Sequence, residues 1–163
     1  MTRWKRTLCA VAGLMLAACA GYGPGNVRPG QTAEEVARAM GAPTGRYTLP
    51  QGGTRLEYAR GPFGKHTYMI DLDAQGRVQR WQQVLTEPNF ESVRAGWTQD
   101  DLLLYLGRPA ERRSGGRQGG EVWSYRYDAV FCQWFQVGVK GGRVTDMAYG
   151  PDPLCDIDHP GMS

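Results

Sequence analysis

The sequence predicts an α+β fold of two tandem units, each a short helical segment followed by a three-stranded antiparallel β-meander. Three observations support this prediction. The stretch at 27–43, VRPGQTAEEVARAMGAP, returns 66 positions later at 93–109 as VRAGWTQDDLLLYLGRP. Both copies carry the start and stop signals of a helix at matching places. After each copy, the spacing of apolar residues changes from the helical period of about 3.6 to the strand period of two.

The first 18 residues have the features of a lipoprotein signal peptide. A basic start, with Arg3, Lys5 and Arg6, precedes an apolar run at 8–18. That run is too short to cross a bilayer, which takes about 20 residues. It ends in LAAC at 16–19, which resembles the lipobox of bacterial lipoproteins and implies that Cys19 becomes the acylated first residue. An ordinary signal peptide that leaves Cys19 as a plain cysteine is the alternative.

Acylation of Cys19 implies a protein that is anchored to a membrane without spanning it. Ala at position 20 implies delivery to the outer membrane, with the chain on its periplasmic side. The glycine- and proline-rich segment at 19–31 is expected to be a tether from the lipid to the fold. The first unit is then expected at 32–85, and the second, with a C-terminal tail, at 86–163.

The charge of the mature chain argues against nucleic acid as a partner. The whole chain has 19 Lys and Arg against 16 Asp and Glu. Three of the basic residues and none of the acidic ones lie in the signal, so the mature chain is near neutral. It lacks the basic excess that binding to a phosphate backbone requires.

Each predicted helix begins at a threonine and stops before a glycine. Thr32 and Thr98 are expected N-caps, and the acidic residue three positions later can bond back to the cap. A glycine and a proline then end each helix. The residues are Thr32, Glu35, Gly41 and Pro43 in the first copy and Thr98, Asp101, Gly107 and Pro109 in the second. Trp97 and Leu102 have the spacing of a hydrophobic staple.

Alternating apolar residues predict the strands. In the first unit they are expected around 56–59, at 68–73 and at 77–85, with a turn at 73–76. In the second they are expected at 121–127, at 131–139 and from 143, after a helical turn that includes Phe90 and Val93. The segment at 111–120, ERRSGGRQGG, is expected to be an exposed flexible connection.

Catalytic signatures are absent from the sequence, which has no nucleophile elbow, P-loop, dinucleotide-binding loop, zinc-protease motif or EF-hand loop. His66 and His159 have no evident partner and are expected to be solvated. Asp71 and Asp73 alternate onto the outward side of a strand, where solvation explains them. We therefore expect no enzyme activity, no cofactor and no metal.

Cys132 and Cys155 are the two cysteines left after the signal and the lipid site. In an oxidising periplasm they are expected to form a disulfide. A two-ligand metal site is the alternative, although the usual CxxC or HxxxH spacing does not accompany them.

Aromatic residues on faces expected to be open are the candidate contacts with a partner protein. They are Tyr58, Trp81, Trp134 and Tyr149. Alternation directs Trp134 away from the helix side of its sheet, and Met147 shares a face with Tyr149. Two other arrangements stay open: the two sheets pack on each other, or the tail from Gly150 covers Trp134.

The order of these features resembles the SmpA/OmlA family of small outer-membrane lipoproteins, to which BamE belongs. The resemblance rests on the lipobox cysteine, the tether, the pattern VxxGxTxx[ED][VL]xxx[ML]GxP, a strand with Tyr58 or Tyr125, and a closing strand that begins G-R-V. It implies a non-catalytic scaffold that assists the insertion of β-barrel proteins, with assembly components or another periplasmic protein as partners. Two tandem units are instead similar to the β-lactamase inhibitor protein. That similarity implies an inhibitor or sensor of a periplasmic hydrolase, which it binds through its sheet face.

Overall fold

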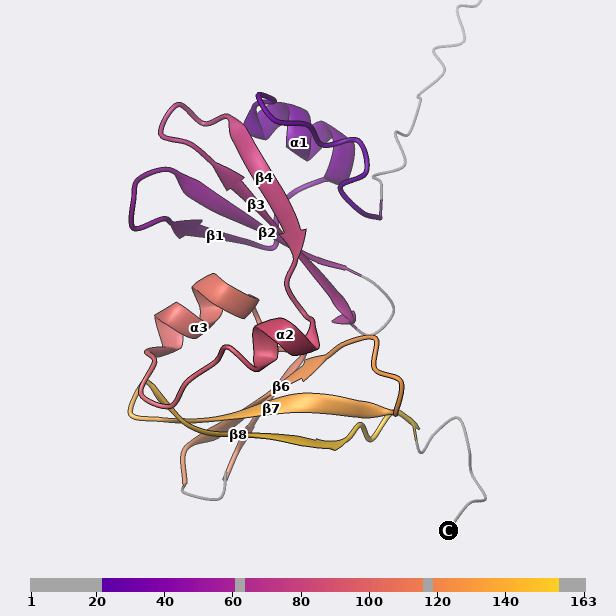
Figure 1. Ribbon diagram of the computed structural model, residues 1–163, viewed down its shortest axis with the longest axis vertical. Helices are drawn as coiled ribbons and strands as arrows, with labels where there is room; N and C mark the ends of the chain where they lie inside the picture. Colours follow the sequence, from indigo (N-terminus) through magenta and orange to yellow (C-terminus); the bar gives the residue numbers. More distant parts are fainter. Residues whose placement is uncertain (1–21, 61–63, 116–118, 156–163) are drawn as a thin grey trace, which may run out of the picture.

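A computed structural model describes residues 22–60, 64–115 and 119–155 of the chain. Within them the fold is α+β, with helices α1 (Ala33–Met40), α2 (Glu87–Phe90) and α3 (Gln99–Leu106) and two antiparallel sheets (Figure 1). Strand order is β1-β2-β3-β4 in the first sheet and β5-β6-β7-β8 in the second. The strands are β1 (Gly45–Thr48), β2 (Thr54–Arg60), β3 (His66–Leu72), β4 (Val78–Gln83), β5 (Glu111–Ser114), β6 (Glu121–Arg126), β7 (Gln133–Lys140) and β8 (Arg143–Pro151).

Both capped helices form as the sequence predicts. The Thr32 side chain accepts a bond from the Glu35 amide, and the Glu35 carboxylate accepts one from the Thr32 amide at 2.7 Å. Thr98 and Asp101 repeat this capping box at the start of α3. The glycine that ends each helix has a φ near +80° and an extended ψ, a combination open almost only to glycine.

Each sheet has a fourth strand, so the prediction of three-stranded meanders is wrong in strand number. The added strands, β1 and β5, are four residues long and pair only with β2 and β6. Such short edge strands are held by backbone bonds and need no apolar alternation, which is the signal that the prediction used. β5 lies in the segment expected to be flexible. Its Arg112 covers Trp123, with the guanidinium carbon 3.9 Å from the ring centroid.

The expected tether at 19–31 is packed over part of its length. Val27 is buried in one core with α1, and the amide of Gly30 donates to the carbonyl of Val78. A single buried valine among glycines and prolines gives no periodic pattern, which is why composition alone indicated a linker. β8 also reaches Pro151, which has no amide proton to donate. β8 is an edge strand, where a missing amide proton is tolerated.

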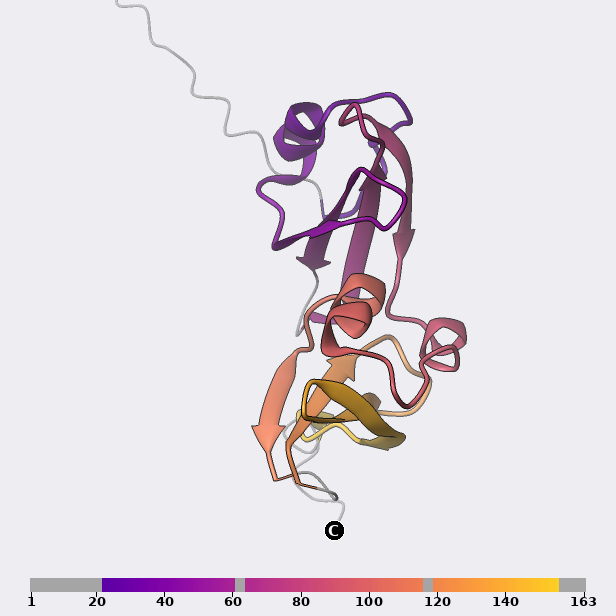
Figure 2. The same cartoon turned by 90° about the vertical axis from the view of Figure 1, so that its left-hand side faces the viewer.

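Four layers stack along the molecule: α1, the first sheet, α3 and the second sheet (Figures 1 and 2). Helix α1 packs on one face of the first sheet through Val36 and Met40. The opposite face meets α3, where the Arg55 guanidinium donates to the Leu104 carbonyl at 2.7 Å. The two sheets therefore pack on each other through a helix. This position explains the sequence of α3, QDDLLLYL, which is apolar on more than one side, whereas α1 is amphipathic.

The repeat is visible in the contacts that close each sheet. The residue pairs Gly30–Val78 and Gly96–Val144, which are 66 positions apart, form the same amide-to-carbonyl bond at 2.8 Å. The arginine of each G-R-V motif, Arg77 or Arg143, donates to the carbonyl of the same glycine. The motif thus ties the last strand of each unit to the segment that enters its helix.

Candidate functional site

The four aromatic residues predicted to contact a partner divide into two buried and two exposed side chains. Tyr58 is 0% exposed and Trp134 is 4% exposed, so the expectation of exposure is wrong for both. Trp81 and Tyr149 are 42% and 43% exposed, as expected. Both exposed residues lie on edge strands, Trp81 on β4 and Tyr149 on β8.

The cover over each buried ring comes from elsewhere in the chain. Tyr58 packs in the core between the first sheet and α1. Trp134 lies on the face of the second sheet away from the helices, as predicted, but Arg126 stands over its ring at 5.0 Å. Asp152 of the tail holds that arginine through a 2.7 Å ion pair. The alternative in which the tail covers Trp134 therefore holds in part.

Cys132 and Cys155 form a disulfide with a Cα–Cα distance of 6.2 Å. It fixes the tail beside the start of β7, where the Asp152 amide donates to the Cys132 carbonyl. Across residues 22–60, 64–115 and 119–155 there is no group of three or more potential metal ligands.

The signal peptide, Cys19 and His159 lie outside the described residues. Among the helices that the structure describes, none is both long enough and apolar enough to span a bilayer.

His66 was expected to be solvated and without a partner, and this expectation is wrong. Its Nε2 lies 2.5 Å from the Asp128 carboxylate, and its Nδ1 is hydrogen-bonded to the Tyr22 hydroxyl. His66 therefore connects the first sheet to the second unit and to the segment that precedes α1. Burial, with the nearby Tyr68 and Asp128, raises the pKa of Tyr22, so its hydroxyl stays protonated at neutral pH and is no activated nucleophile.

Asp71 is buried, which corrects the prediction that it is solvated. Arg55 binds its two carboxylate oxygens at 2.6 and 2.8 Å, and Arg80 adds a contact at 2.9 Å. Burial alone would raise the pKa of Asp71, but hydrogen bonds and charge from the two arginines outweigh it and lower that pKa. Asp73 lies in the expected turn, where its side chain accepts from the Gln75 and Arg77 amides.

Glu57 is a buried carboxylate that the sequence analysis missed. It is 0% exposed and accepts hydrogen bonds from the hydroxyls of Thr44 and Tyr47 and from the Arg108 amide. The Arg108 amide belongs to the loop after α3, so this network joins the two units. In the sequence, Glu57 appears only as a polar residue between apolar neighbours on β2. Alternation assigns such a residue to the solvent side of a strand, so the sequence pattern does not indicate its burial.

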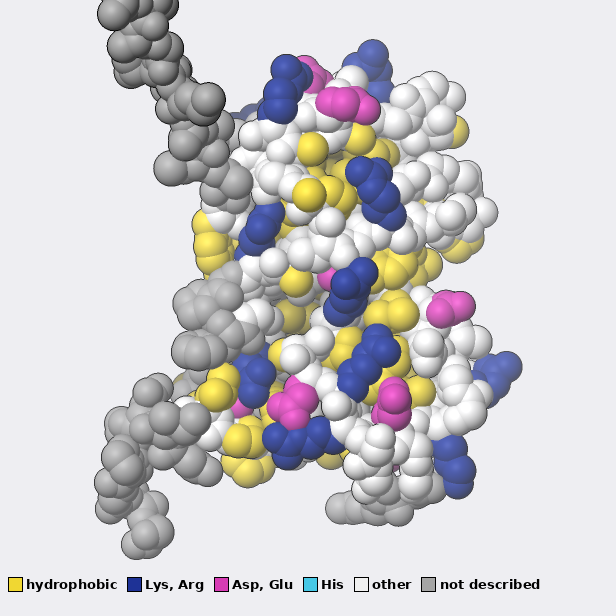
Figure 3. Space-filling view, turned by 180° about the vertical axis from the view of Figure 1, so that it is seen from behind, with side chains coloured by type: hydrophobic (Ala, Val, Ile, Leu, Met, Phe, Trp, Pro, Cys, Tyr) yellow, Lys and Arg dark blue, Asp and Glu magenta, His cyan; other side chains and the backbone are white. Residues whose placement is uncertain are grey.

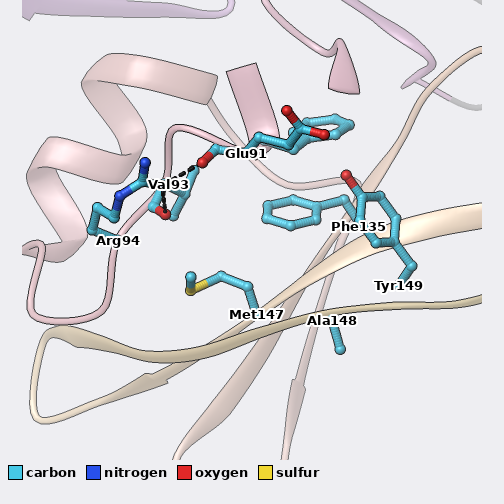
Figure 4. Close-up of a pocket in the computed structure, with 8 residues that line it drawn as sticks. Glu91, Val93, Arg94, Phe135, Met147, Ala148 and Tyr149 are labelled. Carbon is cyan, nitrogen blue, oxygen red and sulfur yellow. Dashed lines mark hydrogen bonds between the residues drawn. The ribbon is translucent and has the colours of Figure 1, made fainter. Parts of the chain in front are cut away.

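An apolar groove runs along the inner side of β8, and we call it the edge groove. Phe90, Val93 and Phe135 form its floor, with Met147 and Tyr149 beside them on the edge strand (Figure 4). The ring of Phe90 stacks on the ring of Phe135 with their centroids 4.5 Å apart, and the centroid of the Tyr149 ring lies 5.4 Å from that of Phe135. The cavity holds about 200 Å³. Phe90 of α2 and the turn after it cover Phe135 on β7, whereas Met147 and Tyr149 on β8 remain more than a third exposed.

Acidic side chains approach the Tyr149 end of the edge groove. Burial raises the pKa of Tyr149, and the negative charges of Glu87 and Glu91 raise it further. Burial likewise raises the pKa of Tyr127 to about 12, with a contribution from its bond to Glu87. Seen from behind, in contrast, the molecule carries basic and acidic side chains interspersed over both units (Figure 3).

Fold and site together define a two-unit α+β repeat protein with an exposed groove at a sheet edge. No protein family model matches the chain, and none of the curated proteins matches it. Among solved structures it is similar to an extracellular protein containing a SCP domain from Bacillus anthracis str. Ames. Sequence identity is 11%, the TM-score is 0.32, and the match covers 99% of this chain and 54% of that one. The chain thus spans about half of that protein, and a likeness this low carries no argument.

Proposed function

We propose that this protein is a non-catalytic outer-membrane lipoprotein of the SmpA/OmlA type. In this proposal it is a protein–protein interaction scaffold in β-barrel protein assembly and envelope integrity. The observation that carries the proposal is the edge groove. An apolar surface beside a sheet edge that the described residues leave largely unpaired is typical of a partner site. The lipobox at 16–19 supplies the location.

The anchor would hold the junction of the two units near the membrane. Tyr22 is three positions after Cys19, so their Cα atoms lie within about 11 Å of each other. Tyr22 contacts His66, which in turn contacts Asp128 of the second unit. A Cys19→Ala variant is expected to move from the membrane fraction to the soluble periplasm. Unchanged fractionation would refute the anchor.

Photo-crosslinking in intact cells tests the partner. A photoreactive amino acid at Tyr149 is expected to capture components of the β-barrel assembly machinery. The same amino acid at Gln75, an exposed turn position in the first unit, serves as the control. Deletion of the protein is expected to sensitise cells to large hydrophobic antibiotics. The proposal fails if Tyr149 captures no assembly component and deletion leaves sensitivity unchanged.

An inhibitor or sensor of a periplasmic hydrolase is the second candidate. A depression of about 250 Å³ on the helix-free face of the second sheet favours it, lined in part by Val122, Gln136 and Gly138. Capture of a soluble hydrolase by a photoreactive group at Gln136, with none at Tyr149, would support this candidate over the first.

A further inference from the structure

The outer edge of β8 is paired only at its start. The amide of Gly96 donates to the Val144 carbonyl, and the Val144 amide donates to the Trp97 carbonyl, each at 2.8 Å. Beyond Val144, no described segment other than β7 makes a backbone hydrogen bond to residues 145–150. An extended chain could therefore continue along this edge the pairing that residues 96–97 begin.

The two faces of that edge differ. Met147 and Tyr149 lie on the side of the edge groove, because they pair across the sheet with Val137 and Phe135. Ala148 points to the opposite side, as alternation requires. Every second side chain of an added strand would thus lie over the apolar floor of the edge groove. The remaining side chains of that strand would lie on the side of Ala148. The cavity of about 200 Å³ has room for one aromatic or large aliphatic side chain, since about 150 Å³ accommodates benzene.

Charge distinguishes the two ends of the groove. Glu87 and Glu91 place negative charge at the Tyr149 end. At the other end, the Arg94 guanidinium is turned to the carbonyls of Glu91 and Val93, and it leaves the Glu91 carboxylate open to a partner. A basic side chain near the Tyr149 end would complement this charge.

We propose that β8 and the edge groove bind an extended polypeptide segment by strand addition. The segment alternates apolar and polar residues, places a large apolar side chain in the groove and carries a lysine or arginine near Glu87 and Glu91. The inference rests on the proposed function and specifies its partner. Alternation of this kind is the pattern of transmembrane β-barrel strands, so the segment fits an unassembled barrel strand.

A capped nine-residue peptide tests the proposal, with the sequence Thr-Phe-Thr-Val-Thr-Phe-Thr-Lys-Thr and a fluorescent label. Its binding to the purified full-length protein is measured by fluorescence anisotropy. The control peptide has the same composition with its three apolar residues contiguous, and it is expected to bind at least about tenfold more weakly. Among the amides at 145–150, those that do not bond to β7 are expected to be protected from hydrogen exchange only when the alternating peptide is present.

Two variants that add the same charge at different positions test whether peptide binding depends on the edge groove. Met147→Lys is expected to raise the peptide Kd at least about tenfold, because it places a charge on the groove face of β8. Gln75→Lys adds the same charge at an exposed turn of the first unit, away from β8, and is expected to change the Kd less than about twofold. Both positions are exposed, and near-native circular dichroism confirms that each variant folds.

Several outcomes would overturn strand addition at β8. They are absence of peptide binding, equal binding of the two peptides, an unchanged Kd for Met147→Lys, or protection of β5 in place of β8. Protection, without peptide, of the amides at 145–150 that do not bond to β7 also overturns it. Such protection assigns the edge to a second copy if it grows with protein concentration, and to the chain's own tail if it does not.

The peptide and crosslinking experiments together distinguish failure of the proposed function from failure of the strand-addition inference. Peptide binding without capture of assembly components in cells removes the proposed function alone. Capture that persists in a Met147→Lys background, with no peptide binding in solution, removes the strand-addition inference alone.

Discussion

Asp71 and Glu57 alternate with core residues on their strands and are buried all the same. Each lies on the face of the first sheet that α3 covers. Buried carboxylates are stable only when their oxygens are bonded, and here arginines, hydroxyls and a backbone amide do so. The buried carboxylates at the junction of the two units therefore stabilise the fold.

Asp71→Asn is expected to lower the free energy of unfolding by about 3 kcal/mol at pH 7, since it leaves Arg55 buried without its counter-charge. The pKa of Asp71 is lowered in the fold, so its stabilising effect is present above the unfolded pKa of about 3.9. It is lost as the pH falls through the folded pKa. The difference from wild type should therefore shrink below about pH 4 in urea titrations.

Asp100→Asn is the matched control for that measurement, because Asp100 is exposed on the first turn of α3. It is expected to change stability by less than about 0.5 kcal/mol. Equal effects of the two substitutions would contradict the role assigned to Asp71.

Among the elements, α1 and α3 begin with the same capping box but lie in different environments. Helix α1 has one covered side, whereas α3 lies between two sheets. The cap geometry is set within four residues, so it is the same in both.

Thr32→Ala and Thr98→Ala are each expected to lower stability by about 1 kcal/mol, because each leaves a helix amide without its acceptor. Guanidinium titration of both variants checks this. Thr48→Ala, at an exposed position of β1, is the control and is expected to change little. A neutral Thr98→Ala would show that packing between the sheets replaces the cap.

The tail is an element held by a cross-link. The disulfide closes a separation of 23 residues, and loop-closure entropy predicts a loss of about 3 kcal/mol when Cys132 and Cys155 are both replaced by serine. Thermal unfolding of this double variant with and without reductant measures the effect. Reductant should destabilise the wild-type protein to the level of the variant and leave the variant itself unchanged.

The whole molecule is expected to unfold as one cooperative unit, because the core around α3 includes buried residues of both sheets. Met69 of β3 is 1% exposed and belongs to the core of the second unit. Met69→Lys should therefore lower hydrogen-exchange protection in both sheets together, with a loss of about 3 kcal/mol or more. Gln79→Lys on the exposed side of β4 is the control. Unchanged protection of β6 and β7 in Met69→Lys would show that the units are independent.

Local rules are sufficient for the parts that the sequence determined. Caps at Thr32 and Thr98, the glycines that end both helices, and the duplication all follow from residues a few positions apart or from direct comparison of the two copies. The exposure of Trp81 and Tyr149 also follows from pattern.

Tertiary structure decided what covers each face and what closes each edge. The burial of Tyr58, Trp134, Asp71 and Glu57 and the edge groove depend on segments far apart in the chain. Arg55 and Leu104, for example, meet across 49 positions. The strands β1 and β5 form by pairing with the strand that follows each of them. Alternation gives the face of a strand on which a side chain lies, but the element packed on that face determines whether the side chain meets solvent, a core or a partner.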